Sequence, residues 1–210
     1  MSTENTPPTT PPTAPRPGRK RSEESRMAIL VAAFELMGEV GYAGLTIEGI
    51  AARAGCGKQT IYRWWRSRAD VLLDVLSVKG ELYVTTADQG SYRDDLRAFL
   101  GDTYGLAGNR QVTGILCALM AEAQIDEGFG ERFRTGFLEG RREALREILD
   151  RAGRRGDLPA RPAPSTVLDL VFGMLWYRVL ATREPFGEDL VDELLALLAP
   201  ESVGSGARKE

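Results

Sequence analysis

The segment Lys58–Trp64 carries the side chains of this 210-residue chain that are best suited to recognition chemistry. It combines two cations, an amide, a hydroxyl and aromatic rings, namely Lys58, Gln59, Thr60, Tyr62, Arg63 and Trp64. Cationic and hydroxyl groups bind phosphate oxygens, whereas lysine and glutamine side chains hydrogen-bond the edges of guanine and adenine. The residue types in this segment therefore indicate contact with a nucleic acid.

Most catalytic chemistry is excluded by composition. The chain contains no histidine, which removes a Ser-His-Asp triad, a Cys-His dyad and any His-ligated metal site. Its two cysteines, Cys56 and Cys117, are too few for a disulfide framework or a structural zinc site. We also find no phosphate-binding glycine loop and no carboxylate pair in a distinctive context. The sequence predicts a protein that is not an enzyme and that uses no cofactor or metal.

The recognition segment falls in the second half of a predicted helix-turn-helix. Thr46 has the position of an N-cap for a short helix, and Gly55 follows that helix where a left-handed residue is favoured. A second short helix is predicted from Lys58 to about Trp65, with Ile61 and Trp65 on its buried side. The same spacing also fits a packed helical hairpin in a bundle, in which the aromatic rings serve only as packing.

The remaining pattern predicts an all-α protein of about nine helices without a sheet. Apolar residues recur at three- and four-residue steps, and no alternation typical of strands is found. Helix starts are indicated at Ser22 and at two capping boxes, Ser67–Asp70 and Ser91–Asp94. We expect a disordered Pro/Thr-rich tail over 1–17, a first helical domain over 18–80 that contains the helix-turn-helix, a second helical domain over 81–200, and a flexible tail over 201–210.

No membrane segment or signal peptide is expected. The longest uninterrupted apolar run, Met27–Phe34, has eight residues, against about 18 for a membrane span. The first residues contain neither a basic nor an apolar region typical of a signal peptide. These features predict a cytoplasmic protein.

The stretch Thr46–Leu72 resembles the DNA-binding motif of the TetR/AcrR family of bacterial transcriptional regulators. The matching positions are Thr46, Ile50, Ala51, Ala54, Gly55, Thr60, Ile61, Tyr62, Trp65, Arg68 and Leu72. Gly57 stands where a serine usually caps the second helix, Cys56 replaces a valine, Trp65 a phenylalanine and Arg68 a lysine. The resemblance implies a dimeric regulator, a repressor by default, that binds a pseudo-palindromic DNA operator and is released by a small molecule.

Roles on DNA follow from the docking of such a helix and from the resemblance. The N-terminal residues of a recognition helix face the bases, so we expect Lys58 and Gln59 to read sequence. The resemblance implies phosphate contacts by Thr46, Thr60, Tyr62 and Arg68, with Arg63 and Trp64 at the border of the groove. The basic run Arg16, Arg19, Lys20 and Arg21 is either a minor-groove arm or a solvated charge run.

The charge distribution agrees with a polyanion partner for the first third alone. Residues 16–79 contain eleven basic and seven acidic side chains, a net charge of +4, whereas the rest of the chain has a net charge of −7. Chance scatter of surface charge gives the same asymmetry about as readily.

The C-terminal half offers a dimer surface and a ligand pocket. The helix near 166–182 is apolar on more faces than one core requires, and with 188–198 it can form half of an intermolecular four-helix bundle. The alternative is a central helix buried in a monomer. Candidate pocket residues are Phe99, Tyr104, Met120, Phe137, Met174, Trp176 and Tyr177, which fit an ordinary core equally well.

No cation of the kind found buried is recognisable in this half, so the sequence favours an apolar or aromatic effector. A different class of function, an all-α adaptor that binds a protein through 166–198, also stays open. Salt dependence separates the two, because DNA affinity falls steeply with salt and an apolar interface does not.

Overall fold

The structure, a computed structural model, describes residues 17–200, and within them the side chains from residue 22 onward. The predicted tails over residues 1–17 and 201–210 therefore lie outside the described residues, Arg16 included, except for Pro17, which the structure places in a helix. Within the described range the chain contains helices and no strand, as the sequence predicts.

Within residues 17–200 the chain forms nine helices, in agreement with the predicted number of about nine, and the first of them is kinked at Gly41. Two of them contain a π-helical segment, named η1 and η2, so that α7, η1 and α8 form one continuous helix and α9 and η2 form another. The elements are α1 (Pro17–Gly44), α2 (Ile47–Arg53), α3 (Lys58–Tyr62), α4 (Arg68–Tyr83), α5 (Tyr92–Gly108), α6 (Arg110–Ile125), α7 (Glu127–Arg132), η1 (Phe133–Leu138), α8 (Glu139–Arg155), α9 (Pro164–Tyr177), η2 (Arg178–Thr182) and α10 (Glu188–Leu198).

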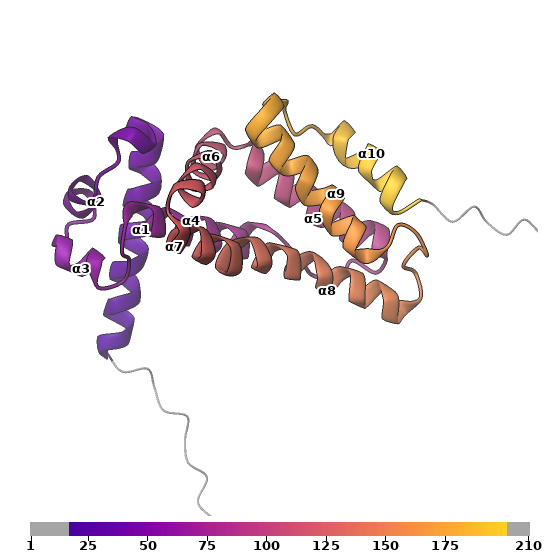
Figure 1. The fold of residues 1–210 in the computed structure, drawn as a ribbon. Coiled ribbons are helices and arrows are strands. Elements are labelled where there is room, and N and C mark those ends of the chain that lie inside the picture. Colours follow the sequence, from indigo (N-terminus) through magenta and orange to yellow (C-terminus); the bar gives the residue numbers. More distant parts are fainter. Residues whose placement is uncertain (1–16, 201–210) are drawn as a thin grey trace, which may run out of the picture.

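The helices form two groups joined through α4 and α6 (Figure 1). At one end, α1 packs against α2, α4 and α6, and α3 packs beside α2. At the other end, α5 packs against α8, α9 and α10. The predicted boundary at residue 80 falls inside α4, which runs without interruption to Tyr83 and so belongs to both groups.

Helix α1 begins at Pro17, earlier than the start predicted at Ser22. Proline is tolerated in the first turn of a helix, because the amide hydrogen that it lacks has no partner there. The backbone of Arg19 and Arg21 is therefore helical, whereas a helix that begins at Ser22 would leave these residues outside it. Their side chains lie outside the described part of the structure.

The segment Ser22–Gly44 of α1 is long and apolar enough to cross a membrane, with a mean hydropathy of 1.4 in its most apolar window. This differs from the expectation based on uninterrupted apolar runs, because hydropathy is here averaged over a longer window. The core helix of a soluble protein passes the same test. Ile29, Ala33 and Met37 of this segment are buried in the protein's own core, which accounts for the apolar stripe.

Both predicted capping boxes are confirmed. The Ser67 hydroxyl accepts a hydrogen bond from the Asp70 amide at the start of α4, and Ser91 does the same with Asp94 at the start of α5. Each serine also donates its hydroxyl hydrogen to the carboxylate of the same partner. The caps fix where α4 and α5 begin.

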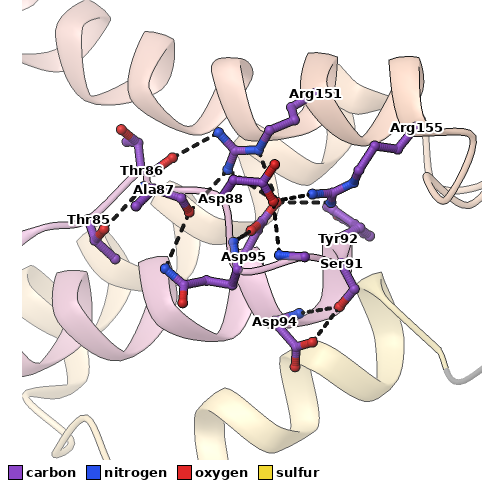
Figure 2. Close-up of polar contacts among 12 residues, drawn as sticks. Thr85, Thr86, Ala87, Asp88, Ser91, Tyr92, Asp94, Asp95, Arg151 and Arg155 are labelled. Atoms are coloured by element: carbon purple, nitrogen blue, oxygen red, sulfur yellow. Dashed lines mark hydrogen bonds and ion pairs between the residues drawn. The ribbon is translucent and has the colours of Figure 1, made fainter.

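A buried carboxylate fastens α5 to the C-terminal half of α8 (Figure 2). Asp95 is 1 % exposed and accepts hydrogen bonds from Arg151 Nε at 3.2 Å, Arg155 Nη2 at 2.9 Å and the Gln89 amide at 2.6 Å. Burial raises the pKa of Asp95, but these hydrogen bonds outweigh it and hold that pKa below its ordinary value. The Asp95 cluster also binds the loop before α5, because Arg151 donates to the carbonyl of Thr86.

Candidate functional site: a nucleic-acid interface and a ligand cavity

The turn between α2 and α3 has the geometry that the sequence predicts. Gly55 has a φ of +63°, a left-handed conformation that strains other residues, although a Cβ at this position would meet no atom within 4 Å. The Thr46 hydroxyl accepts the Gly49 amide at 3.0 Å and caps α2. Gly57 precedes α3 without a side-chain cap, as expected from the missing hydroxyl.

Helix α3 is held by its inner face and leaves its polar face exposed. Ile61 is fully buried and Trp65 is 6 % exposed, as predicted, and Trp65 Nε1 donates to Asp74 Oδ2 of α4 at 3.1 Å. The helix itself ends at Tyr62, three residues earlier than predicted. Of the six predicted contact residues within Lys58–Trp64, Thr60 is half-buried and five are exposed, namely Lys58, Gln59, Tyr62, Arg63 and Trp64.

Lys58 forms an ion pair with Glu48 of α2, with 2.9 Å between Nζ and Oε1. Their hydrogen bond raises the pKa of Lys58 and lowers the pKa of Glu48. Both side chains are more than half exposed, and such surface pairs contribute little to stability. Lys58 is therefore free to exchange Glu48 for a base or phosphate at little cost.

Arg68 is fixed rather than free. It is half-buried at the start of α4, donates Nη1 to the Leu45 carbonyl at 2.6 Å, and lies with Cζ 4.2 Å from the centre of the Tyr42 ring. The Tyr42 hydroxyl in turn donates to Glu122 of α6 at 2.9 Å. Burial and this hydrogen bond raise the pKa of Tyr42. The segment leading into α2 is thus connected to both α4 and α6.

A cavity of about 340 Å³ lies among α4, α5, α6, η1, α8 and α9. Its walls are mostly apolar, with Leu76 and Val84 at α4, Leu116 on α6 and Phe172 on α9. Four polar side chains also reach the lining, namely Thr103, Arg141, Arg142 and Asp169.

Of the seven predicted pocket residues, Phe137 and Trp176 line this cavity and the other five do not. Phe99 and Tyr104 are buried in packing, with the Tyr104 hydroxyl bonded to the Val171 carbonyl at 3.0 Å. Met120 and Met174 are half-buried elsewhere, and Tyr177 is 60 % exposed. The predicted residues lie on α5, α6, η1 and α9, which all contribute to the cavity, but no residue was predicted on α4 or α8, which line it as well.

The expectation that this half lacks a buried cation is wrong. Arg141 Nη2 is buried beside the cavity, and desolvation lowers the pKa of this guanidinium. Arg141 was missed because it stands in the charged run Arg141–Glu143, which is typical of a solvated helix face. Across residues 22–200, no group of three or more cysteine and carboxylate side chains could hold a metal ion.

Comparison with known proteins gives a consistent family for both halves. Residues 29–75 match the model of the bacterial regulatory proteins of the tetR family, and residues 86–198 match a tetracyclin repressor-like C-terminal domain. An uncharacterized HTH-type transcriptional regulator of Bacillus subtilis, YdeS, is 30% identical over 178 residues, which cover 85% of this chain and 89% of YdeS.

Two further proteins extend the comparison. The DNA-binding transcriptional repressor TetR of Mycobacteroides abscessus is 25% identical over 182 residues, covering 85% of this chain and 95% of that one. The crystal structure of the TetR family transcription regulator SCO0332 superposes with a TM-score of 0.71 at 29% identity, covering 82% of this chain and 95% of its own. With a helix-turn-helix whose polar face is exposed and a helical domain that encloses a cavity, the chain belongs to the TetR family of bacterial transcriptional regulators.

Proposed function

We propose that this protein is a cytoplasmic repressor that binds a pseudo-palindromic operator as a homodimer and leaves it when a small molecule enters the cavity. The observation that carries the proposal is the polar face of α3, which Ile61 and Trp65 anchor from below. A helix held in this way enters the major groove without losing its own packing.

On DNA, Lys58 and Gln59 contact base edges from the start of α3. Thr46, Thr60, Tyr62 and Arg68 bind phosphates, while Arg63 and Trp64 border the groove. Arg68 supports this role because its fixed guanidinium needs no reordering on binding. Arg19 and Arg21, close to the start of α1, add positive charge that we assign to the minor groove.

Dimerisation through α9 and α10 is supported by an exposed apolar stripe. Leu170, Tyr177 and Leu180 are 47 %, 60 % and 46 % exposed, and Gly173 is also exposed between them, so that the four follow a 3–4 spacing along α9 and η2. Leu197 of α10 is 70 % exposed. Pairing of two such faces buries the stripe and sets two copies of α3 about 34–36 Å apart, one turn of DNA.

Helix α4 provides the route from the cavity to DNA. Leu76, Gly80 and Val84 line the cavity along its second half, while Arg68 at its start holds the segment that leads into α2. Asp70 near the same end accepts a hydrogen bond from Arg132 of α7 at 2.8 Å. A ligand that displaces α4 therefore moves the helix-turn-helix and changes the spacing of the two α3 helices in a dimer.

Selection from a random-duplex pool at two salt concentrations tests the proposal, with Lys58→Ala and Tyr62→Ala as variants and Arg146→Ala on α8 as the matched control. Enrichment of a pseudo-palindrome by wild type and control is expected. The Lys58→Ala and Tyr62→Ala variants should bind about 10- to 100-fold more weakly, the cost of one specific base or phosphate contact. Failure to enrich any sequence would contradict the proposal and favour an adaptor that binds protein through the stripe on α9.

A further inference from the structure

Arg141 is a half-buried residue whose Nη2 atom is buried without a hydrogen-bond partner. Its Nη2 has no hydrogen bond, and among the described side chains none forms an ion pair with it. The contact that holds it is the Phe99 ring, whose centre lies 5.7 Å from Cζ. Glu81 of α4 is near enough to favour the charged form electrostatically, yet no hydrogen bond joins the two.

Gly80 on α4 makes room for this guanidinium. A Cβ at position 80 would lie 3.0 Å from Arg141 Nη1, tighter than ordinary contact. Arg141 therefore extends from α8 across to α4, along the cavity that both residues line. The charged end of the side chain is thus held at the cavity wall instead of reaching solvent.

Thr103 of α5 provides a second buried polar group without a partner. It is 7 % exposed, its hydroxyl has no hydrogen-bond partner, and it lines the same cavity as Arg141. A buried hydroxyl and a buried cation left without partners both cost free energy, which a molecule in the cavity can recover.

The neighbouring residue shows what a satisfied arginine looks like in this cavity. Arg142 forms an ion pair with Asp169 of α9, with 2.9 Å between Nη1 and Oδ1. Asp169 therefore neutralises Arg142, and the positive charge of Arg141 has no counter-charge of its own in the lining. Arginine does not lose its proton in proteins, and Glu81 favours that charge only at a distance, without a hydrogen bond, so an anion in the cavity can still bind Arg141 directly.

From these observations we propose that the effector is an amphipathic carboxylate. Its apolar body occupies the cavity, and its carboxylate accepts hydrogen bonds from Arg141, with the Thr103 hydroxyl as a further donor. A planar carboxylate matches the fork of a guanidinium, and the apolar walls strengthen that pairing by excluding water. This inference rests on the proposed function, because it names the chemical class of the molecule that releases DNA.

The volume limits the size of the molecule. A cavity of about 340 Å³ is near the lower end of ligand pockets, which span about 300–1,000 Å³. The ring-bearing walls, with Phe137, Phe172 and Trp176, accept either an alkyl chain or an aromatic ring. Suitable probes are therefore octanoate and 4-phenylbutyrate, each compared with its neutral primary amide.

Isothermal titration calorimetry of the full chain with these four probes tests the inference. We expect each acid to bind at least about tenfold more tightly than its amide, the range of one hydrogen bond to a charged group. Arg141→Met should weaken binding of the acids by about 10- to 100-fold and leave binding of the amides unchanged. Thr103→Val, which keeps the shape and removes the hydroxyl, should weaken binding of the acids several-fold.

Arg146→Met is the matched control, because Arg146 lies on the same helix, pairs with Glu143 and is outside the cavity lining. Circular dichroism confirms that each variant is folded. Equal affinity for acid and amide, no binding of either acid, or unchanged binding of the acids by Arg141→Met would overturn the inference. Operator binding of the same preparations is measured separately, so that failure of the proposed function is recognised by loss of sequence-specific DNA binding alone.

Discussion

The arginines at the two ends of α8 differ in whether they have hydrogen-bond partners. Near its C-terminus, Arg151 and Arg155 surround the carboxylate of Asp95, and every group in that cluster has a partner (Figure 2). Near its N-terminus, Arg141 is buried beside a cavity without a partner. The same residue type on one helix thus serves the fold at one end and, in our proposal, a ligand at the other.

This difference follows from what faces each end. The C-terminal end packs against α5 and the loop before it, which provide a carboxylate and backbone carbonyls. The N-terminal end faces apolar side chains across an open volume. Removing one partner from a buried pair is costly, whereas removing a cation that has no partner relieves a cost already present.

The largest expected effect is at Asp95. Asp95→Asn leaves two part-buried arginines without their carboxylate and should lower the free energy of unfolding by about 3–5 kcal/mol. Urea denaturation measures the loss, and Asp192→Asn serves as control, because Asp192 forms an exposed pair with Arg97. An Asp95→Asn variant no less stable than Asp192→Asn would contradict the role given to this cluster.

Truncation of Arg155 and of Arg141 should change the stability of the protein in opposite directions. Arg155→Met removes hydrogen bonds to Asp95 and Asp88 and should destabilise the protein, though less than Asp95→Asn does. Arg141→Met, measured without ligand, removes an unpaired cation and should stabilise by about 1 kcal/mol. Thermal and urea unfolding of both variants check the signs. A loss of stability in both would remove the contrast between the two ends of α8.

Low pH should specifically reduce the stability that the Asp95 cluster contributes. Since the pKa of Asp95 is held below its ordinary value of 3.8, its contribution to stability is complete above that value. The contribution is lost as the pH falls through the lower pKa of the folded state. The stability difference between wild type and Asp95→Asn should therefore shrink from pH 5 toward pH 2 in urea unfolding series, and a constant difference would contradict this reading.

The smallest expected effect is at Gly80. Gly80→Ala places a methyl group against the end of the Arg141 side chain, which can shift, and alanine favours the helix by up to about 1 kcal/mol. Stability should therefore rise slightly, while octanoate binds several-fold more weakly because the guanidinium is displaced. Thermal unfolding of this variant tests the change in stability, and calorimetry tests the change in octanoate affinity. An unchanged octanoate affinity would show that Gly80 does not contribute to the ligand site.

Local sequence signals predicted the DNA-binding end well. The left-handed Gly55, the caps at Thr46 and Ser67, and the buried Ile61 each depend on neighbours a few residues away. Such features are determined by turn and capping chemistry, which is written within the segment itself. The contacts of these residues with DNA remain predictions.

The cavity could be predicted only in part, because it depends on contacts between distant segments. Arg141 lies four residues after Phe137 and four before Leu145, on the face of the helix that both bury, but a charged residue type is typical of an exposed position. Phe137 and Trp176 were found from their ring size, whereas Arg141 shares a charged run with the paired Arg142. Whether an arginine in this charged run is paired depends on which side chains the neighbouring helices bring near it, which the run itself does not show.

The most direct test of the account joins both ends of the molecule in one titration. Fluorescence anisotropy of the selected operator duplex follows wild type and Arg141→Met as octanoate or octanamide is added. We expect octanoate to release wild type from the duplex and octanamide at the same concentration not to release it. Arg141→Met should stay on DNA with either compound. Two results would contradict this expectation. Octanoate and octanamide would both release wild type and Arg141→Met alike, or wild type would stay on the operator at saturating octanoate.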